Sequence, residues 1–377
     1  MDDIEERAKV IYEYKISVQP IENVRILFSD MGRREYGMKK TIIAITIILF
    51  AAGTSIAGGY VAAKYAGEFM ATGTDARALG MGGAYVAVAN GVSAAYWNPA
   101  GLAHLNYPQI MGMYAERFAK LVNYNYGGIA IPSGEKNTLA FSFIRLGVDD
   151  IPVTALPNTD LELGAIYQDG DRTVINSPYV ARTISDAEWA FYLSYAKYIS
   201  HKLMWGSNAK IVTKHVGDNS AWGIGFDFGL LYQLYPRLNI GLNLQDITTT
   251  LLAYDTGRRE AITPTVKLGA TYLWDLPSIK SRVTPAMDFD VRFENRRLAS
   301  QFNMGRVSFD MHTGLEFEFR RIVAVRIGSD VGHFAAGAGF RLPSLNIDYA
   351  FLSHDELGDT HRISLLLTLK EEKFSRK

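Results

Sequence analysis

The side chains that could carry out catalysis are few, and none of them stands in a known catalytic pattern. The seven histidines show no HExxH spacing, the chain has no cysteine, and no GxSxG motif supplies an activated serine. His312 alternates with Asp310 and Glu316 in one segment, which suits an acid/base site or, more simply, a hydrogen-bonded ion network. We therefore expect a protein that is not an enzyme.

Two further motifs have ordinary structural interpretations. His354 to His361, with its neighbouring carboxylates, could ligate a metal but is more typical of a solvated loop. Gly80-Met81-Gly82-Gly83 has the glycines of a dinucleotide loop, but no hydrophobic strand precedes it and no βαβ unit follows it. We expect neither a metal nor a cofactor.

Composition narrows the class of protein. The 39 Lys+Arg balance 39 Asp+Glu, so the chain has no overall positive field for binding nucleic acid. The absence of cysteine excludes disulfide scaffolds and cysteine-ligated metal sites. The aromatic content of 12% and the 34 glycines favour β structure, because aromatic side chains pack well on pleated faces.

The N-terminal region carries an export signal. Met38-Lys39-Lys40 is followed by the apolar run Thr41 to Ala52 and by the small-residue triplet Ser55-Ile56-Ala57. This order predicts a secretory signal peptide over 38–57, since the apolar run is too short to span a bilayer as a helix. A buried core helix is the alternative. Residues 1–37 have no place before a signal peptide, and we expect them to be a mis-annotated upstream extension.

From about Pro108 onward, apolar and polar residues alternate, which is the period of a strand with one apolar face. Trp222, Ile224 and Phe226 share one face of such a segment, and Asp227 and Gly229 lie on the other. The alternation predicts fourteen strands, at 108–118, 121–132, 136–147, 187–200, 202–216, 221–235, 237–248, 264–275, 279–293, 307–319, 322–330, 333–342, 344–353 and 360–370.

The connections and the strand lengths favour a membrane barrel over a soluble two-sheet sandwich. Connections after even-numbered strands are short, whereas four after odd-numbered strands are longer, at 148–186, 249–263, 294–306 and 354–359. Most segments reach the ~9–11 residues that cross a bilayer obliquely. Aromatic side chains gather near segment ends on the apolar face, as in an interfacial girdle. These are Trp189, Trp205, Trp222, Tyr272 and Trp274. We expect a 14-stranded antiparallel transmembrane β-barrel over 108–370, followed by a tail at 371–377.

Charged side chains on the polar face would then enclose the lumen, because a dry sandwich core cannot accept them at several kcal/mol each. The expected lumen network comprises Asp227, Lys267, Asp288, Asp290, Arg292, His312, Glu316, Glu318, Arg326 and Asp348. Opposite charges on adjoining strands can pair with each other or with the segment before the barrel. A large open diffusion channel is therefore not expected.

The segment at 58–107 differs from the barrel in being rich in small residues. Its run GTDARALGMGGAYVAVANGVSAAYWNPAGLA, from Gly73 to Ala103, resembles the N-terminal signature of the PorV/PorQ family within the FadL-like outer-membrane transport superfamily. The ending Leu357 to Leu365 is similar to the last strand of that family. The resemblance implies a fourteen-stranded barrel whose N-terminal segment folds into the lumen as a hatch. The expected hatch residues are Gly73, Asp75, Arg77, Gly80, Gly82, Gly83, Asn98, Pro99, Ala100 and Gly101.

The resemblance leaves two functions open. A PorV-like protein would act in type IX-like protein secretion, contacting secretion-system proteins or secreted cargo through long loops such as 148–186. A FadL-like protein would instead admit a hydrophobic small-molecule ligand. In both cases the partners include outer-membrane lipid but no nucleic acid, and the location is the outer membrane of a double-membraned bacterium.

Overall fold

The computed structural model describes residues 61–62, 66–117, 121–293, 300–353, 358–371 and 375–376. The predicted upstream extension at 1–37 and signal peptide at 38–57 lie outside these residues. Among the described helices, none has both the length and the hydrophobicity to traverse a bilayer.

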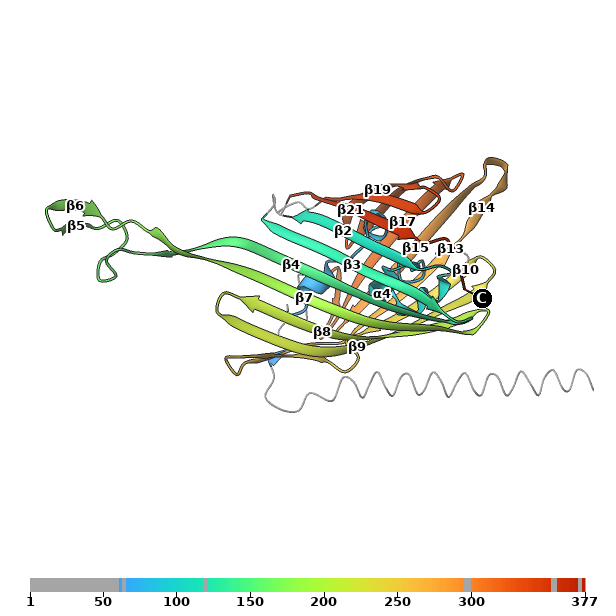
Figure 1. Ribbon diagram of the computed structural model, residues 1–377, viewed down its shortest axis with the longest axis horizontal. Coiled ribbons are helices and arrows are strands. Elements are labelled where there is room, and N and C mark those ends of the chain that lie inside the picture. The colour runs from blue at the N-terminus through green and yellow to red at the C-terminus, as the bar shows by residue number, and fades with distance from the viewer. Residues whose placement is uncertain are drawn as a thin grey trace, which may run out of the picture. The chain divides into compact units, whose positions relative to one another are not determined.

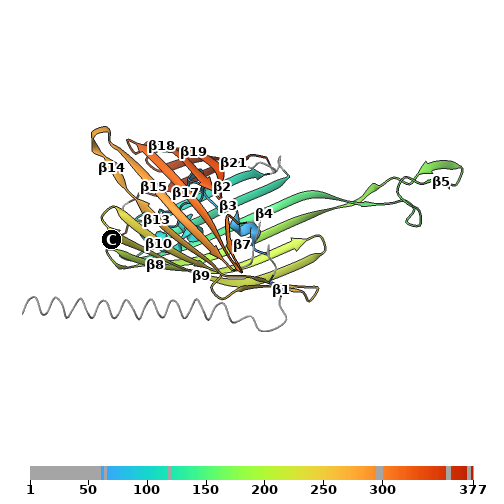
Figure 2. The same ribbon diagram turned by 180° about the vertical axis from the view of Figure 1, so that it is seen from behind.

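Fourteen antiparallel strands form a closed barrel, as the alternation predicts (Figures 1 and 2). Each strand pairs with its neighbours in chain order, and the last pairs with the first through Gln109↔Thr368 to Glu116↔His361. The fourteen are β2 (Gln109–Arg117), β3 (Val122–Ser133), β4 (Asn137–Ala155), β7 (Tyr179–Ser200), β8 (Leu203–Val216), β9 (Asn219–Tyr235), β10 (Leu238–Gln245), β13 (Thr265–Tyr272), β15 (Ser281–Arg292), β17 (Val307–Phe319), β18 (Val323–Asp330), β19 (His333–Arg341), β20 (Leu345–Leu352) and β21 (Thr360–Thr368).

The long connections contain strands that the sequence did not predict. The prediction of a loop over 148–186 is wrong, because β4 and β7 stay paired as far as Ala155↔Tyr179 and a hairpin follows at their tip. β4 contains Pro152 in this stretch, where it is an edge strand, a position that tolerates proline. Shorter strands also lie in other connections. The additional elements are β5 (Ile166–Asp169), β6 (Arg172–Ile175), β11 (Thr250–Tyr254), β12 (Arg259–Ile262), β14 (Trp274–Leu276), η2 (Pro277–Ile279) and β16 (Phe302–Met304).

The apolar face of the strands points outward. Phe226 is 45% exposed and Trp222 58%, whereas Asp227 on the opposite face is only 3% exposed. The outer wall continues in this way around the barrel, with Ile327, Ile363 and many other large apolar side chains exposed. A contiguous belt of this kind is stable against lipid and unstable against water.

The core of the molecule is the N-terminal segment packed inside the barrel wall (Figure 1). It contains four short helices, α2 (Glu68–Ala71), α3 (Ala76–Gly80), α4 (Ala94–Trp97) and η1 (Pro99–His104). The side chain of Asn98 accepts a hydrogen bond from the N–H of Ala100 at 3.2 Å, and Pro99 takes the first helical position. Asn98-Pro99-Ala100 is therefore a capped helix start. We call residues 66–105 the hatch.

Candidate functional site

The hatch rests on glycines of the inner wall. A Cβ added at Gly206 or Gly328 would lie less than 3.0 Å from main-chain atoms of Pro99 or of Gly82. At Gly241 it would lie 2.7 Å from the carbonyl oxygen of Val86. Only glycine lets the two backbones approach so closely. The wall glycines that meet the hatch backbone in this way are Gly206, Gly241, Gly269, Gly314 and Gly328, whereas Gly128 and Gly229 face the hatch side chains of Val92, Asn98 and Pro99.

The hatch also has its own glycine requirement. Gly82 has φ +62° and Gly83 φ +79°, a region that disfavours L side chains. A Cβ at Gly82 would in addition meet the backbone of Ser329. The turn Gly80 to Gly83, which has the glycines of a nucleotide loop, is thus the turn that follows α3 and passes close to the barrel wall.

One chain of ion pairs joins the hatch to the barrel. Arg77 binds Glu316 with two hydrogen bonds, of 2.7 and 2.9 Å. Glu316 also accepts from Nε of Arg326 at 2.6 Å, and Arg326 Nη1 lies 2.8 Å from Asp348. Arg341 closes the series on Asp348 at 2.8 Å. Every member belongs to a chain of alternating charge, so each buried charge has an opposite neighbour.

The electrostatics of the hatch follow from its burial. Burial works to lower the pKa of Arg77, but the Glu316 carboxylate raises the pKa of that guanidinium above its ordinary value. Burial raises the pKa of Asp75, whose side chain accepts hydrogen bonds from Arg77 N–H at 2.9 Å and from Ser93 at 2.7 Å. Arg77 is therefore a permanent cation directed at the wall.

Hydrogen bonds also hold the hatch backbone against β15 and β9. Asp288 accepts from the N–H groups of Tyr85 and Val86 at 2.6 and 2.7 Å. The side-chain nitrogen of Asn98 donates to the carbonyl oxygens of Val86 and Leu230, both at 3.0 Å. These bonds satisfy main-chain groups that the irregular hatch cannot pair internally.

A second charged cluster lies at the long-loop end of the hatch. Lys267 pairs with Asp290, and Nε2 of His312 lies 3.6 Å from Asp290. Nδ1 of His312 lies 2.9 Å from Asp330 and 3.1 Å from the carbonyl oxygen of Gly82. His312 therefore contacts barrel and hatch at once. This geometry fits a member of an ion network rather than a base poised beside a nucleophile.

Most predicted lumen residues are thus brought together, in two groups. Asp227 belongs to a third group, because it pairs with Lys210 at 2.8 Å and accepts from Asn208 at 3.0 Å. Glu318 stands apart and lines a cavity at the short-turn end. Asp246, which pairs with Lys210 at 2.8 Å, and the wall glycines were not predicted as site residues. The wall glycines could have been found from the sequence, because they occupy inward-facing positions of the alternating strands.

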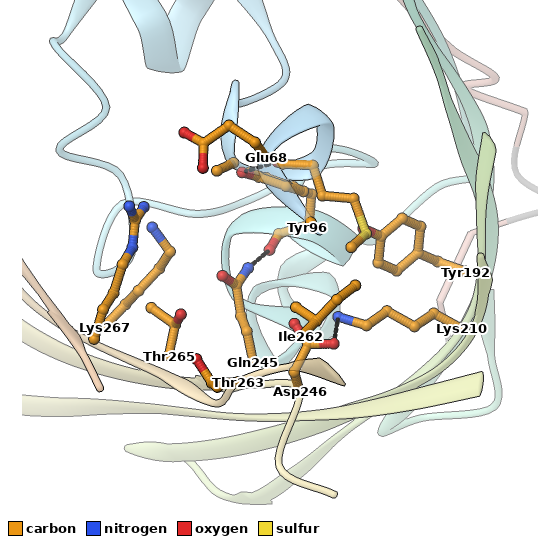
Figure 3. Close-up of a pocket in the computed structure, with 14 residues that line it drawn as sticks. Glu68, Tyr96, Tyr192, Lys210, Gln245, Asp246, Ile262, Thr263, Thr265 and Lys267 are labelled. Atoms are coloured by element: carbon orange, nitrogen blue, oxygen red, sulfur yellow. Dashed lines mark hydrogen bonds and ion pairs between the residues drawn. The ribbon is translucent and has the colours of Figure 1, made fainter. Parts of the chain in front are cut away.

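Cavities flank the hatch at both ends. The cavity at the short-turn end has a volume of about 530 Å³ and is lined by Arg77, Asn90, Glu318 and other polar groups. Two smaller cavities, of about 150 and 50 Å³, lie at the long-loop end. Figure 3 shows the smallest, with Lys210 directed at Asp246 and Gln245 at Tyr96.

This smallest cavity borders an interruption in the barrel ladder. The pairing of β10, β13 and β15 ends at Gln245, Thr265 and Arg292. Beyond that level β9 pairs with β11, β11 with β12, and β12 with β1 (Val61–Ala62) in parallel. In the described part of the chain β12 makes no ladder with β15. We call the boundary between β12 and β15 the seam; Gly67 and Met70 of the hatch reach the cavity beside it.

No protein-family model and no curated protein matches the chain. Solved barrels do resemble it. The toluene transporter TbuX of Ralstonia pickettii is 12% identical, over 79% of this chain and 98% of that chain, with a TM-score of 0.48. A FadL homologue of Pseudomonas aeruginosa is 11% identical, over 78% and 98%, with a TM-score of 0.49. The toluene transporter TodX of Pseudomonas putida is 12% identical, over 78% and 96%, with a TM-score of 0.41.

With identities of 11–12% and TM-scores below 0.5, this similarity does not indicate the function of the chain. The closed ladder, the apolar outer wall and the buried hatch nevertheless define the class, a plugged β-barrel of outer-membrane type. Membership of the PorV/PorQ family stays a prediction.

Proposed function

We propose that the protein admits hydrophobic small molecules across the outer membrane, through the seam beside the hatch. The seam carries this proposal, because it is where the described barrel ladder stops. A ligand dissolved in lipid reaches the seam from the side without crossing the charged lumen. Once inside, it meets Met70 and Ile262 on one part of the smallest cavity, whose lining also includes the charged Lys210, Asp246 and Lys267.

Movement of β1 and the hatch would open this route. The two residues of β1 form one short parallel ladder, Val61↔Glu260 and Ala62↔Ala261. Such a short pairing separates at low cost compared with the antiparallel ladder of twelve residue pairs between β15 and β17.

Fixing β1 on β12 tests the proposal. The chain has no cysteine, so Val61→Cys with Glu260→Cys introduces a single disulfide between register partners. Entry of N-phenylnaphthylamine into proteoliposomes should slow at least about tenfold when the bond is oxidised, and recover on reduction. Ser329→Cys with Phe334→Cys, also register partners, is the control because its bond joins β18 to β19 and leaves β1 free to move. Equal entry in oxidised and reduced protein would refute passage through the seam.

The extension of β4 and β7, with the hairpin of β5 and β6 at its tip, stands where a loop over 148–186 was predicted. This extension favours a second function, contact with another protein. It matches the PorV-like expectation of a barrel that receives secreted proteins at its outer rim. In this function the hatch only seals the lumen, and the locked disulfide has no effect on partner binding.

A further inference from the structure

A two-stranded arm extends from the long-loop rim. Residues 151–155 of β4 pair with 179–184 of β7, and the hairpin of β5 and β6 lies at the far end (Figures 1 and 2). Asp150 has φ +58° at a register shift, which marks a bulge where the arm leaves the barrel. We call residues 149–185 the arm.

The end of the arm has a defined structure. Asn176 is fully buried, and its side chain donates to the carbonyl oxygens of Asn158, Leu161 and Glu162 at 2.8 to 3.2 Å. Its side-chain oxygen accepts from Asn158 N–H at 3.1 Å. The arm therefore carries an ordered head rather than a loose loop.

The arm exposes features that a partner would cover. In the described chain, β4 has no neighbour on its outer side beyond Gly147, so its backbone groups offer an edge for another strand. Ile166 and Ile175 face each other across the tip hairpin and are 70% and 60% exposed. A two-stranded ribbon is marginal in water by itself.

The charge of the arm selects the partner. Although the whole chain is neutral, the arm has six carboxylates and only two arginines, Arg172 and Arg182. Arg182 is already paired with Asp218 at 2.9 Å. None of the six carboxylates makes an ion pair within the described residues. They are Asp149, Asp150, Asp160, Glu162, Asp169 and Asp171.

We infer that the arm binds an extended, basic segment of a partner protein, added as a strand along the edge of β4. A second copy of the arm carries the same negative charge and is repelled, as are anionic lipid headgroups. A segment that alternates lysine with apolar residues would pair with the edge, place cations beside the carboxylates and cover apolar side chains of the arm. This inference rests on the second function and is independent of transport.

Binding of designed peptides to the full-length protein in zwitterionic nanodiscs tests this inference. The probe is a labelled Lys-Val-Lys-Ile-Lys-Val-Lys-Ile peptide, and its counterpart has glutamate in place of lysine. The basic peptide should bind at least about tenfold more tightly than the acidic one, with an affinity that falls as salt rises. The variant D149N/D150N/E162Q/D169N should lose about tenfold in affinity for the basic peptide, and empty nanodiscs should bind neither.

The outcomes distinguish recognition of a basic segment by charge from protein binding by the arm in general. Equal affinity of wild type and neutralised variant for the basic peptide, or tighter binding of the acidic peptide, overturns the charge-based assignment while a protein-binding arm survives. Absence of binding to both peptides overturns strand addition and weakens the second function itself. Circular dichroism and heat-modifiable migration of the variant check that the barrel is intact.

Discussion

Gly206→Val should convert the plugged barrel into an open pore. The added Cβ would occupy the place of Pro99 main-chain atoms, and Pro99 cannot move aside without pulling Asn98 and η1 off the wall. Overpacking of this kind costs about 1–3 kcal/mol or more. Because antiparallel ladders join every barrel strand to both of its neighbours, we expect the hatch to yield first. Entry of arabinose into proteoliposomes should rise at least about tenfold.

Gly112→Val is the matched control, since a Cβ at that strand position meets nothing within 4 Å. It should leave the proteoliposomes as tight as with wild type. Gly206→Ala provides a milder change in case the valine variant does not insert, and it should act in the same direction. Protection of the hatch from protease, together with unchanged arabinose entry in both Gly206 variants, would contradict a wall-seated plug.

Arg326→Ala should destabilise the folded protein by about 3–5 kcal/mol. The Arg326 side chain has no exposed surface and lies between Glu316 and Asp348, at 2.6 and 2.8 Å. Its removal leaves the two buried carboxylates with one arginine each, Arg77 for Glu316 and Arg341 for Asp348. Urea unfolding in lipid bilayers measures the free energy of unfolding.

Arg326→Lys should recover only part of this loss, because one ammonium group cannot bridge two carboxylates as a guanidinium does. Lys202→Ala, in an exposed turn, should change the free energy of unfolding by less than about 0.5 kcal/mol. A loss below about 1 kcal/mol for Arg326→Ala would show that the ion-pair chain contributes little to stability.

Local patterns predicted the barrel because each strand repeats one rule. The expectation of a strand at 307–319 matches Val307–Phe319, since alternation continues to both ends. The arm was missed because Pro152 and the polar residues of 149–185 are typical of loops, and the register that keeps β4 on β7 depends on pairing across distant positions. The bounds of a barrel strand such as β17 follow from its own alternation of apolar and polar residues. The two strands of the arm depend instead on their pairing with each other, which lies outside any short stretch of sequence.

The candidate site was predictable only in part. Inward alternation identified Glu316, Arg326 and Asp348 as lumen charges, but their order in a chain of ion pairs depends on three-dimensional distances. The seat of Pro99 on Gly206 joins residues more than a hundred positions apart. The sequence shows that a glycine stands at position 206, but it does not show that Pro99 packs against it.

The orientation of the strands is the claim on which the rest depends, and spin labels at adjacent residues of β9 test it most directly. A label at Phe226, after Phe226→Cys, should collide freely with dissolved oxygen and be shielded from a water-soluble nickel chelate, because this side chain faces lipid. A label at Asp227 should be protected from oxygen in lipid. Free access of the nickel chelate to position 226, or of lipid-dissolved oxygen to position 227, would contradict a transmembrane barrel with a charged interior.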